Sequence, residues 1–255
     1  MCAVSYLNTV PLVWGMLHGA EREIFDVRFA LPSECADQLN AGEADIGILP
    51  VIEMARQRLE YFRGTGIACH GPVRSILLIS KVPFREIRTV ATDSGSRTSV
   101  MLTRVILAER FGVEPKLISR VADLTTMLGE ADAALLIGDA ALRVDPEKLP
   151  FETLDLGGEW VAMTGLPMVF AVWSGKVCED RYARAFVTSY EYGISRMDEI
   201  VASESRGFAP ELVRKYLTEH IVFKLGEKDY AGLDLFLQQA SRFEPALFEK
   251  RGVLL

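Results

Sequence analysis

The sequence predicts an α/β protein with two lobes and a cleft between them, on three observations. Strands and short helices alternate through residues 26–80, which is typical of α/β sheets with mostly parallel strands. A second run of strands and helices extends from Ile87 to about Gly138. After Cys178 the strand signal fades, and three helices are expected over 179–203, 209–221 and 227–250.

The first unit begins with "DVRFAL" at 26–31, whose alternation of apolar and polar residues indicates a strand. Ser33 is expected to cap a short helix that Gly42 ends. "ADIGILPV" at 44–51 is nearly continuous in apolar residues, as in a strand buried on both faces. Two more strands are expected in this unit, at 65–69 and 75–80.

The second unit begins with "IRTVATD", a strand that starts at Ile87. Apolar residues at helical spacing then predict a helix that ends at Gly112. A short helix is expected at 122–130. The remaining strands of this region are "PKLISR" at 115–120, "DAALLIG" at 132–138 and "MVFAVWS" at 168–174.

These patterns suggest how the chain divides between the lobes. We expect residues 1–82 together with 174–255 in the first lobe, and 83–173 in the second. The crossings are then expected around Ile76–Val82 and Val169–Trp173. Two crossings side by side would form a hinge, and a ligand would lie between the lobes.

Composition narrows the classes of function. The 255 residues are 49% hydrophobic and carry a net charge of −7, which argues against disorder and against a basic nucleic-acid surface. The four cysteines form no CxxC pair and there are three histidines, so a structural zinc site is not expected. We expect thiols in a reducing compartment, and no export signal or membrane-spanning run is recognisable.

The strongest candidate for binding an anion is "TDSGSRTSV" at 92–100, which follows a strand and opens a helix. Free N–H groups at a helix N-terminus attract anions, and an arginine fork binds carboxylate or phosphate. The alternative is an ordinary N-cap at Ser96 beside a solvated Arg97. The candidate ligand-binding residues here are Ser94, Ser96, Arg97, Thr98 and Ser99.

"CHGPVRSILL" at 69–78 joins two strands through a turn at Gly71 and Pro72. His70 lies next to the expected cleft, although a lone histidine is more often structural. Ser75 begins the next strand, where its hydroxyl can face the cleft. No GxSxG or SxxK pattern is present, so Ser75 is not expected to be an acyl-transfer nucleophile.

Two further stretches offer candidate residues for the cleft. In "LIGDAAL" at 136–142, Gly138 and Asp139 either form the far wall of the cleft or simply start a helix with an N-cap. In the stretch from Asp155 to Trp173, Trp160 could stack on a ligand, Thr164 could donate a hydrogen bond and Gly165 leaves room. The alternative for this stretch is a turn with a core tryptophan.

"SYLNTVPL" at 5–12 ends the first strand with polar residues and gives no sign of a helix-capping box. Pro11 can start a helix because its missing N–H would be unpaired there anyway. Open α/β sheets bind ligands at the carboxyl ends of their strands. We therefore expect Tyr6, Asn8 and Thr9 to face the cleft between the lobes.

Six stretches together resemble the menaquinone-biosynthesis family of the futalosine pathway, and within it the branch that dehydrates chorismate. They are "SYLNTVPL", "ADIGILPV", "GPVRSILLIS", "DSGSRTSV", "LIGDAAL" and "EWVAMTGLPMVFAVW". The resemblance implies a type II periplasmic-binding-protein-like fold. It also implies a hydro-lyase without cofactor or metal, which removes water from chorismate to give 3-(1-carboxyvinyloxy)benzoate. Its cleft residues map onto Asn8, Ser75 and the "SGSRTS" loop.

The expected mechanism is an elimination. The "SGSRTS" loop with Arg97 would hold one carboxylate, while Asn8 and Ser75 would hydrogen-bond the reacting end of the substrate. The proton acceptor stays open among His70, Asp139 and a carboxylate of the substrate itself. The alternative function is a non-catalytic binder of a small cyclic or aromatic carboxylate. A cytoplasmic protein with no nucleic-acid or membrane partner is expected, and a homodimer stays open.

Overall fold

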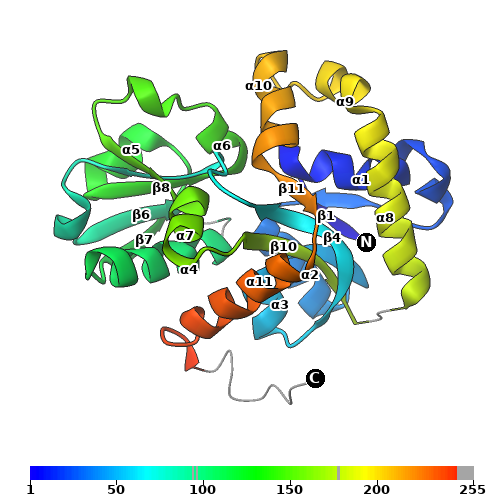
Figure 1. Ribbon diagram of the computed structural model, residues 1–255, viewed down its shortest axis with the longest axis horizontal. Coiled ribbons are helices and arrows are strands. Elements are labelled where there is room, and N and C mark those ends of the chain that lie inside the picture. The colour runs from blue at the N-terminus through cyan, green and yellow to red at the C-terminus, as the bar shows by residue number, and fades with distance from the viewer. Residues whose placement is uncertain (94, 96, 177–178, 246–255) are drawn as a thin grey trace.

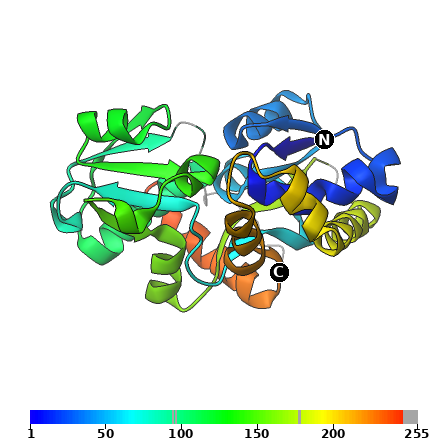
Figure 2. The same cartoon turned by 90° about the horizontal axis from the view of Figure 1, so that it is seen from above.

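A computed structural model describes residues 1–93, 95, 97–176 and 179–245 of the chain (Figure 1). Two β-sheets lie in two lobes, and helices surround each sheet, as Figure 1 and the view from above in Figure 2 show. The predicted two-lobed α/β architecture is confirmed.

The first sheet contains the N-terminal strand. Its members are β1 (Cys2–Val4), β2 (Arg28–Ala30), β3 (Ile46–Pro50), β4 (Glu60–Cys69), β10 (Met168–Gly175) and β11 (Val222–Lys224). They lie in the order β11-β4-β10-β3-β1-β2. β3 and β10 are buried along their whole length, as expected for strands covered on both faces.

The second sheet is formed by the middle of the chain. Its members are β5 (Ile76–Ser80), β6 (Thr89–Asp93), β7 (Lys116–Arg120), β8 (Ala133–Ile137) and β9 (Glu152–Asp155). They lie in the order β7-β6-β8-β5-β9. Strands β5 and β8 are fully buried at the centre of this lobe.

Both sheets are mixed, so the expectation of mostly parallel strands is only half right. β1 pairs in parallel with β2 and β3, and β6 does so with β7 and β8. β10 is antiparallel to β3 and β4, and β5 is antiparallel to β8 and β9. The reason is that β5 and β10 enter their sheets from the neighbouring lobe and run against the parallel strands.

Helices join and cover the strands. They are α1 (Val10–His18), α2 (Pro32–Ala41), α3 (Val51–Arg56), α4 (Arg97–Ile106), α5 (Leu124–Glu130), α6 (Gly138–Leu142), α7 (Leu156–Thr164), α8 (Asp180–Ser195), α9 (Met197–Ser203), α10 (Pro210–Lys215) and α11 (Glu227–Ala240). α11 packs on β10 and α3 of the first lobe and on α4 of the second. None of the described helices has the length and apolar character needed to cross a membrane.

The lobe boundaries expected at 82/83 and 173/174 do not match the sheets. They would place β5 in the first lobe and β10 in the second, whereas each strand belongs to the other sheet. The chain crosses at residues 70–75, between β4 and β5, and returns between α7 and β10. A buried apolar strand fits either sheet equally well, so its sequence does not say which one it joins.

Several helices differ from their predicted form. Gly42 and Gly112 end helices as predicted, but α2 begins at Pro32, so Ser33 is not its N-cap. α7 replaces the turn expected before Trp160, because the Asp155 carboxylate accepts a hydrogen bond from the Gly158 N–H and caps the helix. The C-terminal region also divides more finely than predicted, into α8 and α9, then α10, β11 and α11.

Candidate active site

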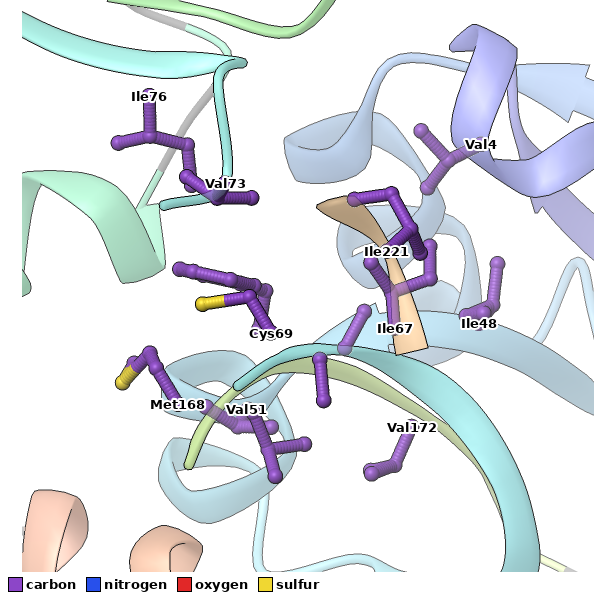
Figure 3. Packing of buried hydrophobic residues seen from close by; sticks show 14 of the residues in the cluster. Val4, Ile48, Val51, Ile67, Cys69, Val73, Ile76, Met168, Val172 and Ile221 are labelled. Atoms are coloured by element: carbon purple, nitrogen blue, oxygen red, sulfur yellow. The ribbon is translucent and has the colours of Figure 1, made fainter. Parts of the chain in front are cut away.

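A cavity lies between the two lobes, where the carboxyl ends of several strands meet. Its lining encloses about 540 Å³ of space without protein atoms, part of it open to solvent. The walls are largely apolar: Val73 and Ile76 face the first lobe, where Val4 and Ile67 lie (Figure 3). The full lining is Val4, Tyr6, Asn8, Pro32, Pro50, Ile67, Val73, Ser75, Ile76, Thr98, Ser99, Ile137, Gly138, Phe170 and Ala171.

The polar groups in this wall come mostly from three of the predicted stretches. Tyr6 and Asn8 come from the first lobe, Ser75 from the crossing segment, and Thr98 and Ser99 from the first turn of α4. The structure therefore brings together residues far apart in the chain, as predicted. A few polar groups in an apolar cavity are typical of a small-molecule site.

Ser75 lies at the centre of a buried hydrogen-bonded group. Its side chain is 2% exposed, and its Oγ accepts a hydrogen bond from the Tyr216 hydroxyl at 2.9 Å. Burial raises the pKa of Tyr216, although hydrogen bonds with Ser75 and Asn8 oppose this. The Tyr216 side chain is consequently a neutral hydrogen-bond donor at ordinary pH.

The segment before Ser75 is held by contacts on both sides. The Asp155 carboxylate accepts hydrogen bonds from the N–H of Val73 at 2.9 Å and of Arg74 at 2.6 Å. Arg74 has a φ of +67°, in the left-handed region, and its guanidinium donates to two backbone carbonyls at the end of α6. The strained backbone and its many partners fix the position of the chain at Ser75.

Asn8 lies in a 3₁₀ turn, Leu7–Thr9, directly after β1. Its Oδ1 is buried and has no hydrogen-bond partner among the described residues. The turn is fixed from the second lobe, because the Leu7 N–H donates to Asp139 Oδ1 at 3.1 Å. A buried amide oxygen without a partner costs free energy, so a ligand that donates a hydrogen bond to Asn8 is favoured.

Asp139 is an anchor between the lobes and does not line the cavity. Its Oδ2 accepts a hydrogen bond from the Arg206 guanidinium at 2.9 Å, and the same guanidinium donates to the Ser5 carbonyl. Asp139 is therefore neither a wall of the cavity nor the N-cap of α6, which were the two roles expected for it.

Tyr6 reaches across from the first lobe to the second. Its ring lies against Gly138, where an added Cβ would come within 2.9 Å of the ring. Gly138 also has a φ of +53°, which favours glycine. Burial, and then the charges of Asp93 and Asp139, raise the pKa of the Tyr6 hydroxyl.

The α4 turn reaches the cavity through its hydroxyls and not through its arginine. The Thr98 Oγ1 accepts a hydrogen bond from the Ile52 N–H at 3.4 Å, and Ser99 lines the cavity. Arg97 lies outside the lining and pairs with the buried Glu53 at 2.8 Å and with Asp37 at 3.2 Å. The predicted Ser94 and Ser96 lie outside the described residues.

Other predicted residues also lie away from the lining. The His70 side chain is exposed, and its Nε2 lies 2.9 Å from Oδ1 of the buried Asp229. Trp160 is a core residue that donates to the Pro167 carbonyl. The remaining members of this group are Thr9, Gly71, Pro72, Thr164 and Gly165, of which Thr9 is fully buried beside the lining residue Asn8.

The cavity also contains residues that the sequence did not single out. Pro32, Pro50 and Phe170 form apolar walls, and Tyr216 lies behind Ser75. Pro50 could have been identified from the sequence, because it ends "ADIGILP", a predicted strand whose carboxyl end reaches the cavity. Within the described residues, no cluster of three or more histidine, cysteine, aspartate or glutamate side chains could hold a metal ion.

Comparison with known proteins points to one family. A family model described as menaquinone biosynthesis matches residues 1–242. The chain is 30% identical to the chorismate dehydratase of Thermus thermophilus over 91% of this chain and 92% of that protein. It is 25% identical to the chorismate dehydratase of Campylobacter jejuni, over 92% and 94% of the two chains.

Solved structures of distant relatives share the fold. Protein AF1704 from Archaeoglobus fulgidus has a TM-score of 0.75 and 16% identity, covering 95% of this chain and 96% of its own. The periplasmic aliphatic sulphonate binding protein SsuA from Escherichia coli has a TM-score of 0.63 and 15% identity, covering 96% and 86%. At these identities the likeness shows a periplasmic-binding-protein-like fold and nothing more.

Proposed function

The chain belongs to the menaquinone biosynthesis family, and from this premise we propose that it is a chorismate dehydratase. The reaction removes water from chorismate to give 3-(1-carboxyvinyloxy)benzoate. The observation that carries the proposal is the cavity between the lobes, in which Asn8 and Ser75 present polar groups within apolar walls. A planar aromatic product with two carboxylates suits a cavity of this kind.

The chemistry requires three events. A proton leaves a ring carbon, the bond between the neighbouring carbon and its hydroxyl breaks, and the departing hydroxyl takes up a proton to leave as water. Formation of an aromatic ring drives the reaction, so the protein has to position the substrate and stabilise the charge that develops. We assign Asn8 and Ser75, which line the cavity, to hydrogen bonds with the reacting end.

The proton acceptor is proposed to be a carboxylate of the substrate itself. His70 and Asp139, the two candidates from the protein, do not line the cavity. Among the described lining residues the one group that titrates is the Tyr6 hydroxyl, whose pKa is raised mainly by burial. A neutral phenol is not a base at ordinary pH, so a carboxylate held over the ring is the acceptor that remains.

The other carboxylate of the substrate is assigned to the first turn of α4. The hydroxyls of Thr98 and Ser99 lie there, and the positive end of the helix dipole favours an anion. Arg97 does not take the role expected for it, because Glu53 and Asp37 occupy its guanidinium. Its ion pairs instead join α4 to the helices of the first lobe.

The proposal also covers the pathway, the compartment and the partners of the protein. We place the reaction in the futalosine route to menaquinone, in the cytoplasm, without a cofactor and without a nucleic-acid or membrane partner. A homodimer stays open, and light scattering of the purified protein distinguishes it from a monomer. A binder of a cyclic carboxylate is the alternative function, and it is not favoured by the relatives that match the chain.

The test is to incubate the purified protein with chorismate and follow the loss of diene absorbance together with the aromatic product. The wild type is expected to turn over, and Ser75→Ala is expected to lose at least about 10²-fold in kcat. Ser80→Ala is the matched control, because Ser80 is a buried serine at the other end of β5 that donates to the Val82 carbonyl. Equal losses in both variants would contradict the assignment of Ser75.

A further inference from the structure

We propose that Tyr216 is a positioning residue for the dehydration: its hydroxyl donates to Ser75 and so directs the proton of the Ser75 hydroxyl into the cavity. The inference rests on the proposed function, since it assigns a role within that same site. Tyr216 lies outside the cavity lining and therefore acts through its neighbours, not on the substrate.

The hydrogen bond between the two hydroxyls runs from Tyr216 to Ser75. The Tyr216 hydroxyl and Ser75 Oγ are 2.9 Å apart, and both side chains are almost fully buried, at 1% and 2% exposure. A hydroxyl has one proton to donate. When Ser75 accepts from Tyr216, its own proton is left for another acceptor, and the cavity lies on that side of Ser75.

Asn8 is close enough to Tyr216 to lower the pKa of the Tyr216 hydroxyl, against the larger effect of burial. Asn8 Oδ1 has no partner among the described residues and can accept a hydrogen bond from the substrate. The buried phenol thus lies beside both polar residues assigned to the reacting end, and its hydrogen bond to Ser75 is the contact through which it acts.

The backbone that carries Tyr216 also has an unusual conformation. The helix that starts as α10 continues as a π-helical turn over Tyr216–His220. Such turns are rare and occur frequently at functional sites. This one contacts the segment that carries Ser75 at two points, through Tyr216 on Ser75 and through His220 Nδ1, which lies 2.9 Å from the Pro72 carbonyl.

Loss of the Tyr216 hydroxyl should therefore slow the chemical step without weakening substrate binding. Removal of the Tyr216 hydroxyl leaves the cavity walls unchanged, so the substrate still binds. The Ser75 hydroxyl then loses its fixed orientation, and a misplaced group of this kind costs about 10²-fold in rate. The loss therefore appears in kcat and not in KM.

The test compares Tyr216→Phe with Tyr230→Phe. Tyr230 is a matched control, because it is also a buried tyrosine whose hydroxyl makes a hydrogen bond, here with the Gly64 N–H at 2.8 Å, away from the cavity. For Tyr216→Phe we expect kcat to fall about 10²-fold, with KM and affinity for the aromatic product within about threefold of wild type. For Tyr230→Phe we expect kcat near wild type, and a similar small loss of thermal stability in both variants.

Three outcomes would overturn the proposal. They are an unchanged kcat in Tyr216→Phe, a loss that appears in KM and product affinity, and an equal loss of kcat in Tyr230→Phe. The wild type in the same assay separates this proposal from the proposed function. If the wild type is active and Tyr216→Phe is unaffected, only the role of Tyr216 is refuted. If the wild type leaves chorismate unchanged, the proposed reaction and the role of Tyr216 are both refuted.

Discussion

Gly138 is where the two lobes come into close contact at the cavity, and replacing it by alanine should destabilise the protein. Two effects add. A residue other than glycine at a φ of +53° costs roughly 1–2 kcal/mol. The new Cβ would lie 2.9 Å from the Tyr6 ring, and overpacking of this kind costs about 1–3 kcal/mol. The expected total is about 2–5 kcal/mol.

Two other glycines separate these effects. Gly165 has a φ of +70° but open space around it, so Gly165→Ala carries the backbone strain alone. Gly129 lies in α5, with no positive φ and nothing nearby, so Gly129→Ala should stabilise by up to about 1 kcal/mol. At about 3 °C per kcal/mol, differential scanning calorimetry should give a loss of roughly 3–6 °C for Gly165→Ala and roughly 6–15 °C for Gly138→Ala.

The contact between Tyr6 and Gly138 also joins the lobes, so its disruption should weaken substrate binding. Tyr6 and Gly138 both line the cavity, so a displaced Tyr6 ring should change its shape and raise KM about tenfold. Gly165→Ala should leave KM unchanged, because Gly165 lies at the far end of α7. Equal melting temperatures and equal KM values for Gly138→Ala and Gly165→Ala would refute the reasoning.

Three further predictions concern charged and titrating groups. Asp139→Asn should lower the free energy of unfolding, measured in urea, by about 1 kcal/mol, because the ion pair with Arg206 is lost. Its kcat should stay within about threefold of wild type. A large loss of kcat at unchanged stability would instead indicate that Asp139 is the base. Glu53→Gln should lower stability by about 2 kcal/mol, because two arginines pair with this buried carboxylate; a melting temperature equal to wild type would contradict this. Raised pKa values of Tyr6 and Tyr216 stabilise the fold below about pH 10, so the unfolding free energy should fall with rising pH above it, and less steeply in Tyr216→Phe than in wild type; equal slopes would contradict this.

Part of the site could be predicted because it follows from sheet geometry. Asn8 and Ser75 lie beside strand ends, and strand ends in α/β proteins meet at one edge of the sheet. Thr98 and Ser99 follow β6 by the same logic. These residues were therefore identified without knowledge of any contact.

The rest depended on contacts between distant parts of the chain. Arg97 was expected to bind substrate, but Glu53 and Asp37 reach it from helices more than forty residues earlier. Tyr216 was missed because the sequence predicts an ordinary helix over 209–221, and only the tertiary structure brings it to Ser75. Lobe membership of β5 was missed for a similar reason, since apolar strands carry no signal for the sheet they join.

The central claim is that the cavity at Asn8 and Ser75 converts chorismate. The most direct measurement is a single-turnover reaction with protein in excess over chorismate, quenched and analysed by mass spectrometry. The account predicts that wild type converts all of the chorismate to an aromatic product lighter by one water, and that Ser75→Ala leaves it largely intact on the same timescale. Chorismate that is bound by the wild type but recovered unchanged would contradict the claim and indicate a binding protein.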